Sequence, residues 1–529
     1  MQSDPKRLLC IALLCLGAIY VFRGGLNLYF AQEDFRGLAV GAGVYPRHQH
    51  LWRYVSVQAF MDVFYPLFRD RPWPYHAVSL AFHCVNGALL FALFSRHLTK
   101  QAAIVGATFF VVHPALFTAL YWQSARADIL AGTFALTTVI LALRPGRERW
   151  LAVPSFALSL LSKEATVSLP AVIALLAWWR AKNETTDSAP RGTSRLLAAL
   201  FLMSAGYLTY LARPREVGIA IGFDVGAAYA IDFGSSLLRN LLTYVGWTVD
   251  LAMLRPGLRF VDRQNPALFP FAVGVLVVVG LLALWPALRR RGWLAGLVGF
   301  LLLLVPVLPL RNHAYHYYLY LPLMAAALCL ASLADVLLGQ TDAPRTHARG
   351  NAKGNRPDSA TKHVSHASWV AAGLCWLALT WNGARLVTQM EKRPSPVYPG
   401  LMGDPIVDRA LIAERAIKGL RAAPIPSGTE LVFIMRERIA LMARIARGSG
   451  EEPPPSQEVY PETNVRAALF DGTGVRALVS HVDSVSFTSS PGSPAPHRRY
   501  AVYAPTGEVE VFDAVSLDSL LRSSWVSQW

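Results

Sequence analysis

Two adjacent carboxylates, Glu33 and Asp34, follow the first apolar segment of the chain directly. Charged side chains at a membrane edge are costly unless they are solvated, paired or used. Mutual repulsion and a low-dielectric setting raise the pKa of one carboxyl in such a pair, and a carboxyl that titrates near neutral pH suits a general base. A solvated helix cap at the start of a loop would have the same sequence, so the spacing leaves both interpretations open.

A second group surrounds a proline turn. His113-Pro114 ends one apolar segment, and Arg126 and Asp128 stand at the head of the next. Proline stops a helix and leaves carbonyl groups in need of partners. Arg126, Asp128 and His113 are candidate site residues, although a lone histidine beside proline is more often a hydrogen-bonded structural residue than a ligand. An ion pair that only shapes the loop is the alternative.

Two further charged sites interrupt apolar runs. The first is Lys163-Glu164. The second is Arg311 with His313, which precede a tyrosine-rich stretch. Tyrosines at a membrane interface usually form an aromatic belt, whereas an anionic headgroup needs fixed cations. Arg311 and His313 are therefore candidate ligands for an anionic headgroup, and Lys163-Glu164 is a further candidate charged site. An interfacial salt bridge that anchors the turn is the alternative for Lys163-Glu164.

The elements that position these groups are apolar helices. Hydrophobic residues make up 53% of the 529 residues, charged residues only 16%, and the mean hydropathy is +0.35. This composition excludes a purely soluble, disordered or collagen-like protein. We predict an α-helical polytopic membrane protein with eleven spans, near 8–22, 76–95, 102–121, 128–143, 149–161, 165–179, 195–212, 267–287, 293–310, 315–338 and 368–387.

The net charge of +16 is explained by lysine and arginine kept in cytoplasmic loops rather than by nucleic-acid binding. This distribution predicts an inner N-terminus, a cytoplasmic tether at 340–367, and long outer loops at 23–75 and 213–266. The apolar stretch 236–253 would then lie at the interface or be re-entrant, although a full span is the other possibility.

Beyond Pro394 the chain becomes polar and proline-rich, and short apolar runs alternate with turn signals. We therefore expect a transmembrane domain at 1–389 and a small extramembrane α/β domain at 390–529. The predicted location is a bacterial inner membrane, with the second domain on the periplasmic side. The five cysteines all lie in apolar stretches and have no disulfide or metal-site spacing.

In this topology the acidic, basic and histidine groups gather at outer-face turns. A site there meets lipid laterally and water from outside. Such a position suits an enzyme with one substrate carried on a membrane phospholipid and a second, polar acceptor.

The pattern Val112-His113-Pro114, then Trp122, Arg126 and Asp128, resembles a motif of the multispanning C-fold glycosyltransferases. The resemblance is to the protein O-mannosyltransferase-like branch, which includes the transmembrane and tetratricopeptide-repeat O-mannosyltransferases. It covers about residues 8–340, although the repeats themselves do not follow. Similar motifs occur in the same order at Glu33-Asp34, Trp73-Pro74-Tyr75-His76, Leu161-Ser162-Lys163-Glu164 and Tyr318-Leu319-Tyr320-Leu321-Pro322.

Two departures are visible. Glu33-Asp34 stands where that branch usually has two aspartates, and His316-Tyr317 stands where a charged pair is common. The resemblance implies an inverting hexosyltransferase that moves a sugar from a polyprenyl-phosphate donor to a hydroxyl of a protein or glycan. It implies Asp34 as the general base beside Glu33, donor phosphate bound by Arg126, Lys163, Arg311 and His313, and orientation by His113, Asp128 and Glu164.

Some relatives use a divalent metal at the acidic loop, but no ligand set in the sequence requires one. Two other classes stay open. An O-antigen polymerase or ligase would use a lipid-linked oligosaccharide, and a lipid-linked saccharide transporter would have charges at mid-span and two related halves. The sugar, the acceptor and the role of 390–529 are not determined by the sequence; acceptor recognition is our hypothesis for 390–529.

Overall fold

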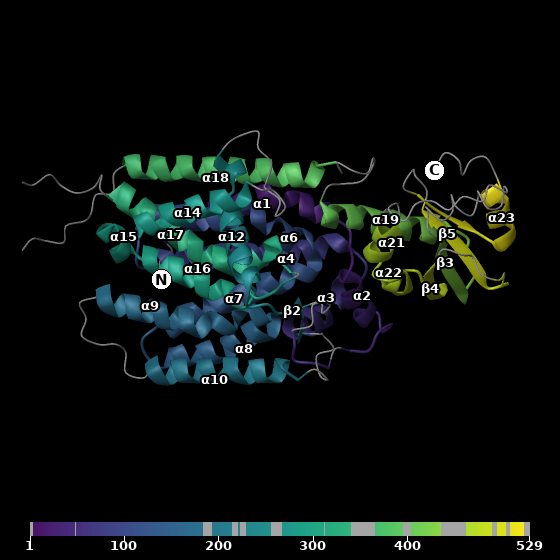
Figure 1. Ribbon diagram of the computed structural model, residues 1–529, viewed down its shortest axis with the longest axis horizontal. Coiled ribbons are helices and arrows are strands. Elements are labelled where there is room, and N and C mark those ends of the chain that lie inside the picture. The colour runs from purple at the N-terminus through teal and green to yellow at the C-terminus, as the bar shows by residue number, and fades with distance from the viewer. Residues whose placement is uncertain are drawn as a thin grey trace, which may run out of the picture.

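The computed structural model is elongated, with a helical body at one end and a small sheet at the other (Figure 1). It describes residues 4–47, 49–183, 193–213, 221–222, 229–254, 267–311, 313–339, 366–394, 404–434, 462–488, 493, 495–503 and 508–522. The predicted tether 340–367 lies outside these residues except for its last two positions, which begin a helix.

Six helices among the described residues are long and apolar enough to cross a membrane. Three of them continue from or into a short 3-10 turn. The six are α1 (Pro5–Phe22, with η1 at Arg23–Asn27), α4 (Pro72–Phe94), α7 (Arg126–Ala142, after η4 at Gln123–Ala125), α10 (Thr193–Leu211), α17 (Tyr320–Gly339, after η7 at His316–Leu319) and α18 (His366–Lys392).

A seventh span is broken. α5 (Lys100–Val111) and α6 (Phe117–Tyr121) are bent by 44° where His113-Pro114 interrupts the helix, and η3 (Pro114–Leu116) lies between them. Proline cannot donate the backbone hydrogen bond that would continue α5.

The other four predicted spans are helices of 11 to 15 residues, shorter than the roughly 20 that cross a bilayer unaided. The polytopic helical architecture is confirmed, while the number eleven stays a prediction. These helices are α8 (Ala152–Ser162), α9 (Leu169–Asn183), α14 (Leu268–Leu282) and α16 (Trp293–Leu304).

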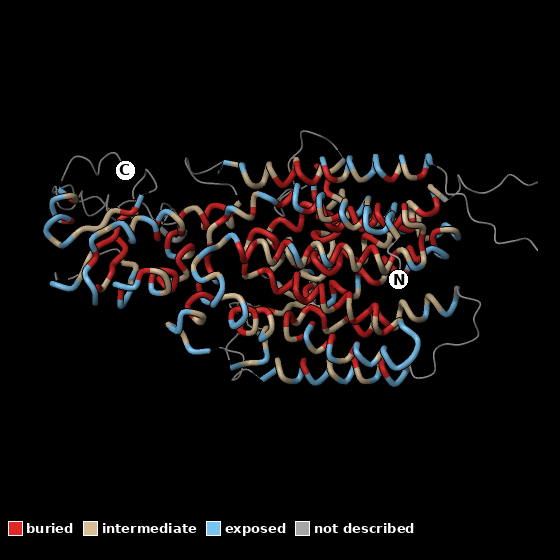
Figure 2. Tube along the Cα trace, turned by 180° about the vertical axis from the view of Figure 1, so that it is seen from behind, coloured by how far each residue is buried: buried red, intermediate tan, exposed pale blue. Residues whose placement is uncertain are grey.

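Close helix packing forms the centre of the body, where Figure 2 shows mostly buried residues, whereas α18 and α10 at its edges alternate between buried and exposed ones. A Cβ added to Gly106 of α5 would lie 2.6 Å from the Ala327 carbonyl oxygen of α17, so only glycine allows this approach. A buried polar contact ties α4 to α17. Tyr320 Oη lies 2.8 Å from His83 Nδ1 and accepts a hydrogen bond from Asn86 Nδ2 over 2.9 Å.

The predicted outer loop 23–75 folds into short helices, α2 (Asp34–Gly41), the π-helical turn η2 (Val55–Ala59) and α3 (Phe60–Phe68). The segment 236–253 is also helical, as α12 (Ser235–Thr248) and α13 (Leu251–Leu254). The remaining elements of the body are η5 (Arg147–Leu151), η6 (Glu164–Ser168), β1 (Ile221–Gly222), β2 (Tyr229–Ala230) and α15 (Pro286–Arg291).

A four-stranded sheet of order β4-β3-β5-β6 forms the other end of the molecule. β3 (Thr429–Ile434) is parallel to β4 (Val482–Thr488) and β5 (Arg498–Tyr503), and β6 (Val509–Phe512) is antiparallel to β5. The accompanying helices are α19 (Pro405–Ala422), α21 (Glu462–Ala468), α22 (Thr473–Leu478) and α23 (Ala514–Arg522). α18 ends at Lys392, beyond the predicted boundary at 389/390.

The acid-bearing loop packs directly on this C-terminal α/β region. Phe35 shares one buried apolar cluster with Ile412 and Val475, and the Gln32 N–H donates to the Ala468 carbonyl over 3.0 Å. Tyr45 Oη lies 2.8 Å from Thr473 Oγ1. The first outer loop is therefore held between the helical body and the sheet.

Candidate functional site

A cavity of about 1230 Å³ opens where the helical body, the first outer loop and the start of α19 meet. Four residues predicted from the sequence line it: Glu33, Arg126, Lys163 and His313. A carboxylate and several cations thus share one space with aromatic side chains.

The two acidic residues have different surroundings. Glu33 is exposed on the cavity wall, whereas Asp34 is buried and does not line the cavity. Asp34 Oδ1 accepts hydrogen bonds from Ser124 N and Ser124 Oγ, each over 2.6 Å, and Oδ2 accepts one from Ala31 N over 3.1 Å. Asp34 therefore fixes the turn that leads into α7.

Burial raises the pKa of Asp34 to about 6, although the Ser124 hydrogen bond acts in the opposite direction. Partial desolvation at the cavity wall raises the pKa of Glu33, against the influence of Arg409, Arg53 and Arg36.

Arg126 is held by backbone carbonyls at the same turn. Its Nε donates to Ser56 O over 3.0 Å and one terminal nitrogen donates to Gln123 O over 2.9 Å. Its guanidinium carbon lies 4.4 Å from the ring centroid of Phe60. The two hydrogen bonds and the Phe60 ring orient the cation without neutralising it.

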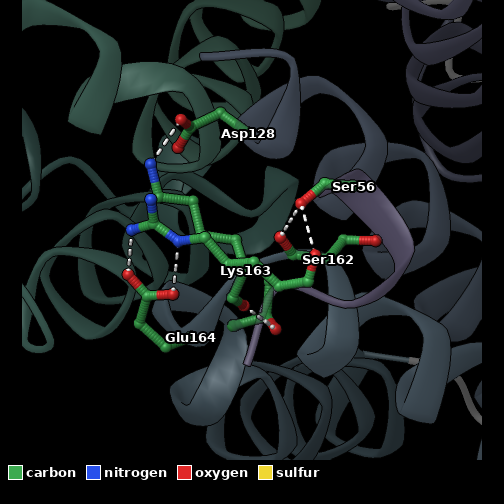
Figure 3. Close-up of polar contacts among 7 residues, drawn as sticks. Ser56, Asp128, Ser162, Lys163 and Glu164 are labelled. Atoms are coloured by element: carbon green, nitrogen blue, oxygen red, sulfur yellow. Dashed lines mark hydrogen bonds and ion pairs between the residues drawn. The ribbon is translucent and has the colours of Figure 1, made fainter. Parts of the chain in front are cut away.

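Two ion pairs, one buried and one half-buried, lie side by side at the Lys-Glu link, as Figure 3 shows. Lys163 pairs with Asp128, and the side chains of both are 2% exposed. Glu164 pairs with Arg53, whose Nε donates to Glu164 Oε2 over 3.0 Å beside a second hydrogen bond. The Lys163 ammonium also lies 4.7 Å from the Tyr317 ring centroid. Asp128 thus contacts Lys163, one of the predicted cations, whereas Glu164 contacts Arg53, which is not among them.

Burial would raise the pKa of Glu164, but the Arg53 guanidinium lowers it to about 2. For Lys163, burial lowers the pKa and the Asp128 carboxylate partly compensates. Ser56 Oγ donates to Ser162 O over 2.8 Å, which joins the first outer loop to this link.

Three predicted residues have other surroundings. His313 lines the cavity and stacks on Tyr229 with ring centroids 4.6 Å apart. Arg311 is exposed and lies outside the cavity lining, because its backbone continues a short bridge and donates to Ala230 O. His113 Nδ1 accepts from Ala115 N, and Nε2 lies 3.1 Å from Thr248 O. Both ring nitrogens thus meet backbone groups, which leaves His113 holding the proline turn rather than a cation.

Several cavity residues are not identified by sequence reasoning. Arg53 lies in a motif-free loop and adopts a φ of 52°, a backbone conformation that costs about 1–3 kcal/mol in a non-glycine residue. Such strain is only visible in the structure. The other missed residues with charged or hydroxyl side chains are Arg36, Ser56, Thr118, Ser124, Tyr229, Arg239, Arg393, Asp404 and Arg409.

Aromatic side chains form much of the remaining wall, and their flat apolar faces suit a sugar ring. Within the described ranges, no group of three or more His, Cys, Asp or Glu side chains is arranged to hold a metal ion. The acids on the described part of the wall are Glu33 and Asp404, so we derive no step through a metal. The aromatic lining includes Trp52, Trp122, Tyr229, Trp247, Tyr315 and Tyr317.

The chain has the overall fold of ArnT from Cupriavidus metallidurans, which was solved bound to undecaprenyl phosphate. The two structures match with a TM-score of 0.50 and 11% sequence identity, over 94% of this chain and 93% of the other. The likeness concerns the fold and covers nearly the whole chain. The oligosaccharyltransferase of Archaeoglobus fulgidus, tethered to an acceptor peptide, matches more distantly, with a TM-score of 0.41 and 12% identity over 82% of this chain and 62% of that one.

No protein-family model and no curated protein matches the sequence. The membrane class of the protein therefore rests on its apolar helices and its fold. The O-mannosyltransferase-like branch, the inner membrane and the periplasmic orientation stay predictions.

Proposed function

We propose that this protein is a membrane glycosyltransferase that moves a sugar from a polyprenyl-phosphate donor to a hydroxyl acceptor. The observation that carries the proposal is the shared cavity, in which Glu33 faces the same space as Arg126 and Lys163. A base for the acceptor and cations for the leaving phosphate are the two groups that this chemistry needs. The fold shared with ArnT, a protein solved with undecaprenyl phosphate, supports the choice of lipid carrier.

Within the acidic pair we assign proton transfer to Glu33 and positioning to Asp34. A general base must reach the proton that it removes, and Glu33 is the carboxylate on the cavity wall. Asp34 is engaged by three hydrogen bonds from Ser124 and Ala31. This assignment differs from the expectation from the sequence, in which Asp34 is the general base. The reason is that Asp34 is buried, whereas the neighbouring Glu33 lies on the cavity wall.

The reaction begins when Glu33 accepts the proton of the acceptor hydroxyl. The hydroxyl oxygen forms a bond to the anomeric carbon as the bond from that carbon to the phosphate oxygen breaks. A single displacement inverts the anomeric centre and needs one carboxylate, not the nucleophile–acid pair of retaining enzymes. The polyprenyl phosphate leaves with its electron pair.

Arg126 and Lys163 stabilise the negative charge that develops on the phosphate. Cations that are fixed before the reaction need no reorganisation when charge appears. Arg126 is fixed by two carbonyls and Lys163 by Asp128, while the Arg53–Glu164 pair supports Lys163 from the side. His313 lies on the same wall as a further donor to the phosphate.

Purified full-length protein in lipid nanodiscs tests this proposal with a panel of labelled polyprenyl-phosphate hexoses and a mixed peptide and glycan acceptor fraction. We expect release of free polyprenyl phosphate together with label in the acceptor. Transfer only from a lipid-linked oligosaccharide would instead indicate a polymerase or ligase. Movement of intact donor across the bilayer without bond cleavage would indicate a transporter.

A further inference from the structure

The cavity has a second group of cations, away from the Lys-Glu link. The described residues that line it include seven arginine or lysine side chains and two acidic ones. Two of these cations, Arg53 and Lys163, are already paired with Glu164 and Asp128. The five that remain are Arg36, Arg126, Arg239, Arg393 and Arg409.

Arg409 reaches this space from α19, in the C-terminal region. Its Nε is buried and has no hydrogen-bond partner among the described residues, and the same holds for Nε of Arg393 at the end of α18. Among the cations that act on Glu33, Arg409 has the largest influence, ahead of Arg53 and Arg36. Arg409 therefore shares the cavity with Glu33 and acts on its carboxylate.

The second acid on the wall, Asp404, interacts with Arg409, but one carboxylate does not balance five guanidinium groups. Asp404 Oδ1 accepts hydrogen bonds from Ile406 N over 2.9 Å and Val407 N over 3.3 Å, so its carboxylate caps α19. The contacts of the C-terminal region with the acid-bearing loop, including Gln32 N to Ala468 O, keep α19 in place.

One donor phosphate does not account for five cations. Arg126 lies at the turn beside the Lys-Glu link, where we place the donor phosphate, whereas Arg393 directly follows α18 and Arg409 lies on α19. Guanidinium groups that line one cavity, two of them with a buried Nε that has no partner among the described residues, favour an anionic ligand that accepts charge-assisted hydrogen bonds. The neutral hydroxyl compound that the transfer reaction alone requires would leave their positive charge unbalanced.

We infer that the acceptor is an anionic saccharide, with a carboxylate or phosphate near its reacting hydroxyl, and that Arg393 and Arg409 bind this anionic group. The inference rests on the proposed transfer function and adds the class of its second substrate. The aromatic walls favour a saccharide, because ring faces can stack on them. Through Arg409 the C-terminal region completes the acceptor side of the cavity.

The test compares binding and transfer for matched saccharides. A hexuronate-containing oligosaccharide, a phosphorylated one and their neutral parents are titrated calorimetrically against the full chain in nanodiscs, and then supplied as acceptors. The variants are R393Q, R409Q and, as the control, K418Q. Lys418 lies on the same helix as Arg409, but its side chain is 73% exposed and pairs with Glu414.

We expect the wild type to bind an anionic saccharide about tenfold more tightly than its neutral parent, a difference of about 1.4 kcal/mol. R409Q and R393Q should abolish that preference while donor affinity and neutral-acceptor binding stay unchanged, and K418Q should behave as wild type. Whichever of the two anionic probes carries the preference identifies the anionic group.

Equal binding of anionic and neutral saccharides would overturn the inference, even if transfer to neutral acceptors were efficient. A preference for the anionic probes that R409Q and R393Q leave intact would overturn the assignment of these arginines. Anionic preference without transfer would instead count against the proposed transferase function and retain the anionic site. Binding and turnover thus separate the two claims.

Discussion

Ser124 donates two hydrogen bonds to one oxygen of Asp34, from its backbone N–H and from its hydroxyl, each over 2.6 Å. The partners lie 90 positions apart in the chain, so this contact fixes the first outer loop against the turn before α7. Arg126 begins α7 and lines the cavity, while Glu33 precedes Asp34. One buried carboxylate therefore sets the distance between the proposed base and a proposed phosphate ligand.

The raised pKa of Asp34 predicts a pH-dependent contribution to stability. An acid with a folded-state pKa of about 6 and an ordinary value of 3.8 binds more protons in the native state between these values. The Asp34 contribution to the free energy of unfolding should therefore fall as pH rises from about 4 to 6, by about 3 kcal/mol. Melting temperatures of wild type and D34N across this range measure the difference. Parallel curves for the two proteins would contradict the assignment.

The buried pair Lys163–Asp128 should tolerate joint replacement better than the loss of one partner. K163M leaves the Asp128 carboxylate buried without its cation, which typically costs about 3–5 kcal/mol. The double variant K163M/D128L should recover most of that loss in melting temperature, yet remain without transfer activity. A double variant that is less stable than K163M would show that the pair itself stabilises the fold.

Arg126 and Arg311 should differ sharply as donor ligands. R126K keeps the charge but loses the planar guanidinium that two carbonyls hold, so donor KM should rise or kcat should fall about tenfold or more. R311Q should leave both constants unchanged, because Arg311 lies outside the cavity lining. Equal losses in the two variants would indicate that Arg311 moves into the site when donor binds.

His113 should act on stability rather than on donor binding. H113A leaves the Ala115 N–H and the Thr248 carbonyl without their partner, at a cost of about 1–3 kcal/mol. We expect a lower melting temperature with donor Kd unchanged. A weaker donor Kd in a stable H113A protein would return His113 to the orienting role expected from the sequence.

Sequence motifs identify some of the charged residues that line the cavity and not others. Glu33, Arg126 and Lys163 stand in short patterns at the ends of apolar segments, so their convergence on the cavity could be predicted. Arg53 and Arg409 lie in no pattern, and only tertiary packing brings them to Glu33.

The direction of a side chain cannot be predicted from sequence spacing either. Spacing does not show that Glu33 faces the cavity and that Asp34 faces the interior. Helix lengths were less predictable still. An apolar run reveals hydrophobicity, but α8 and α16 end after 11 and 12 residues, at turns set by their packing.

The most direct test of the account compares E33Q with D34N in single-turnover transfer from a labelled polyprenyl-phosphate sugar. Both variants should retain donor binding. E33Q should slow the chemical step by about 10²–10⁴-fold, as expected for loss of a general base, and D34N should slow it less. Near-complete loss in D34N, with E33Q close to wild type, would contradict the account and identify Asp34, acting through Ser124, as the base.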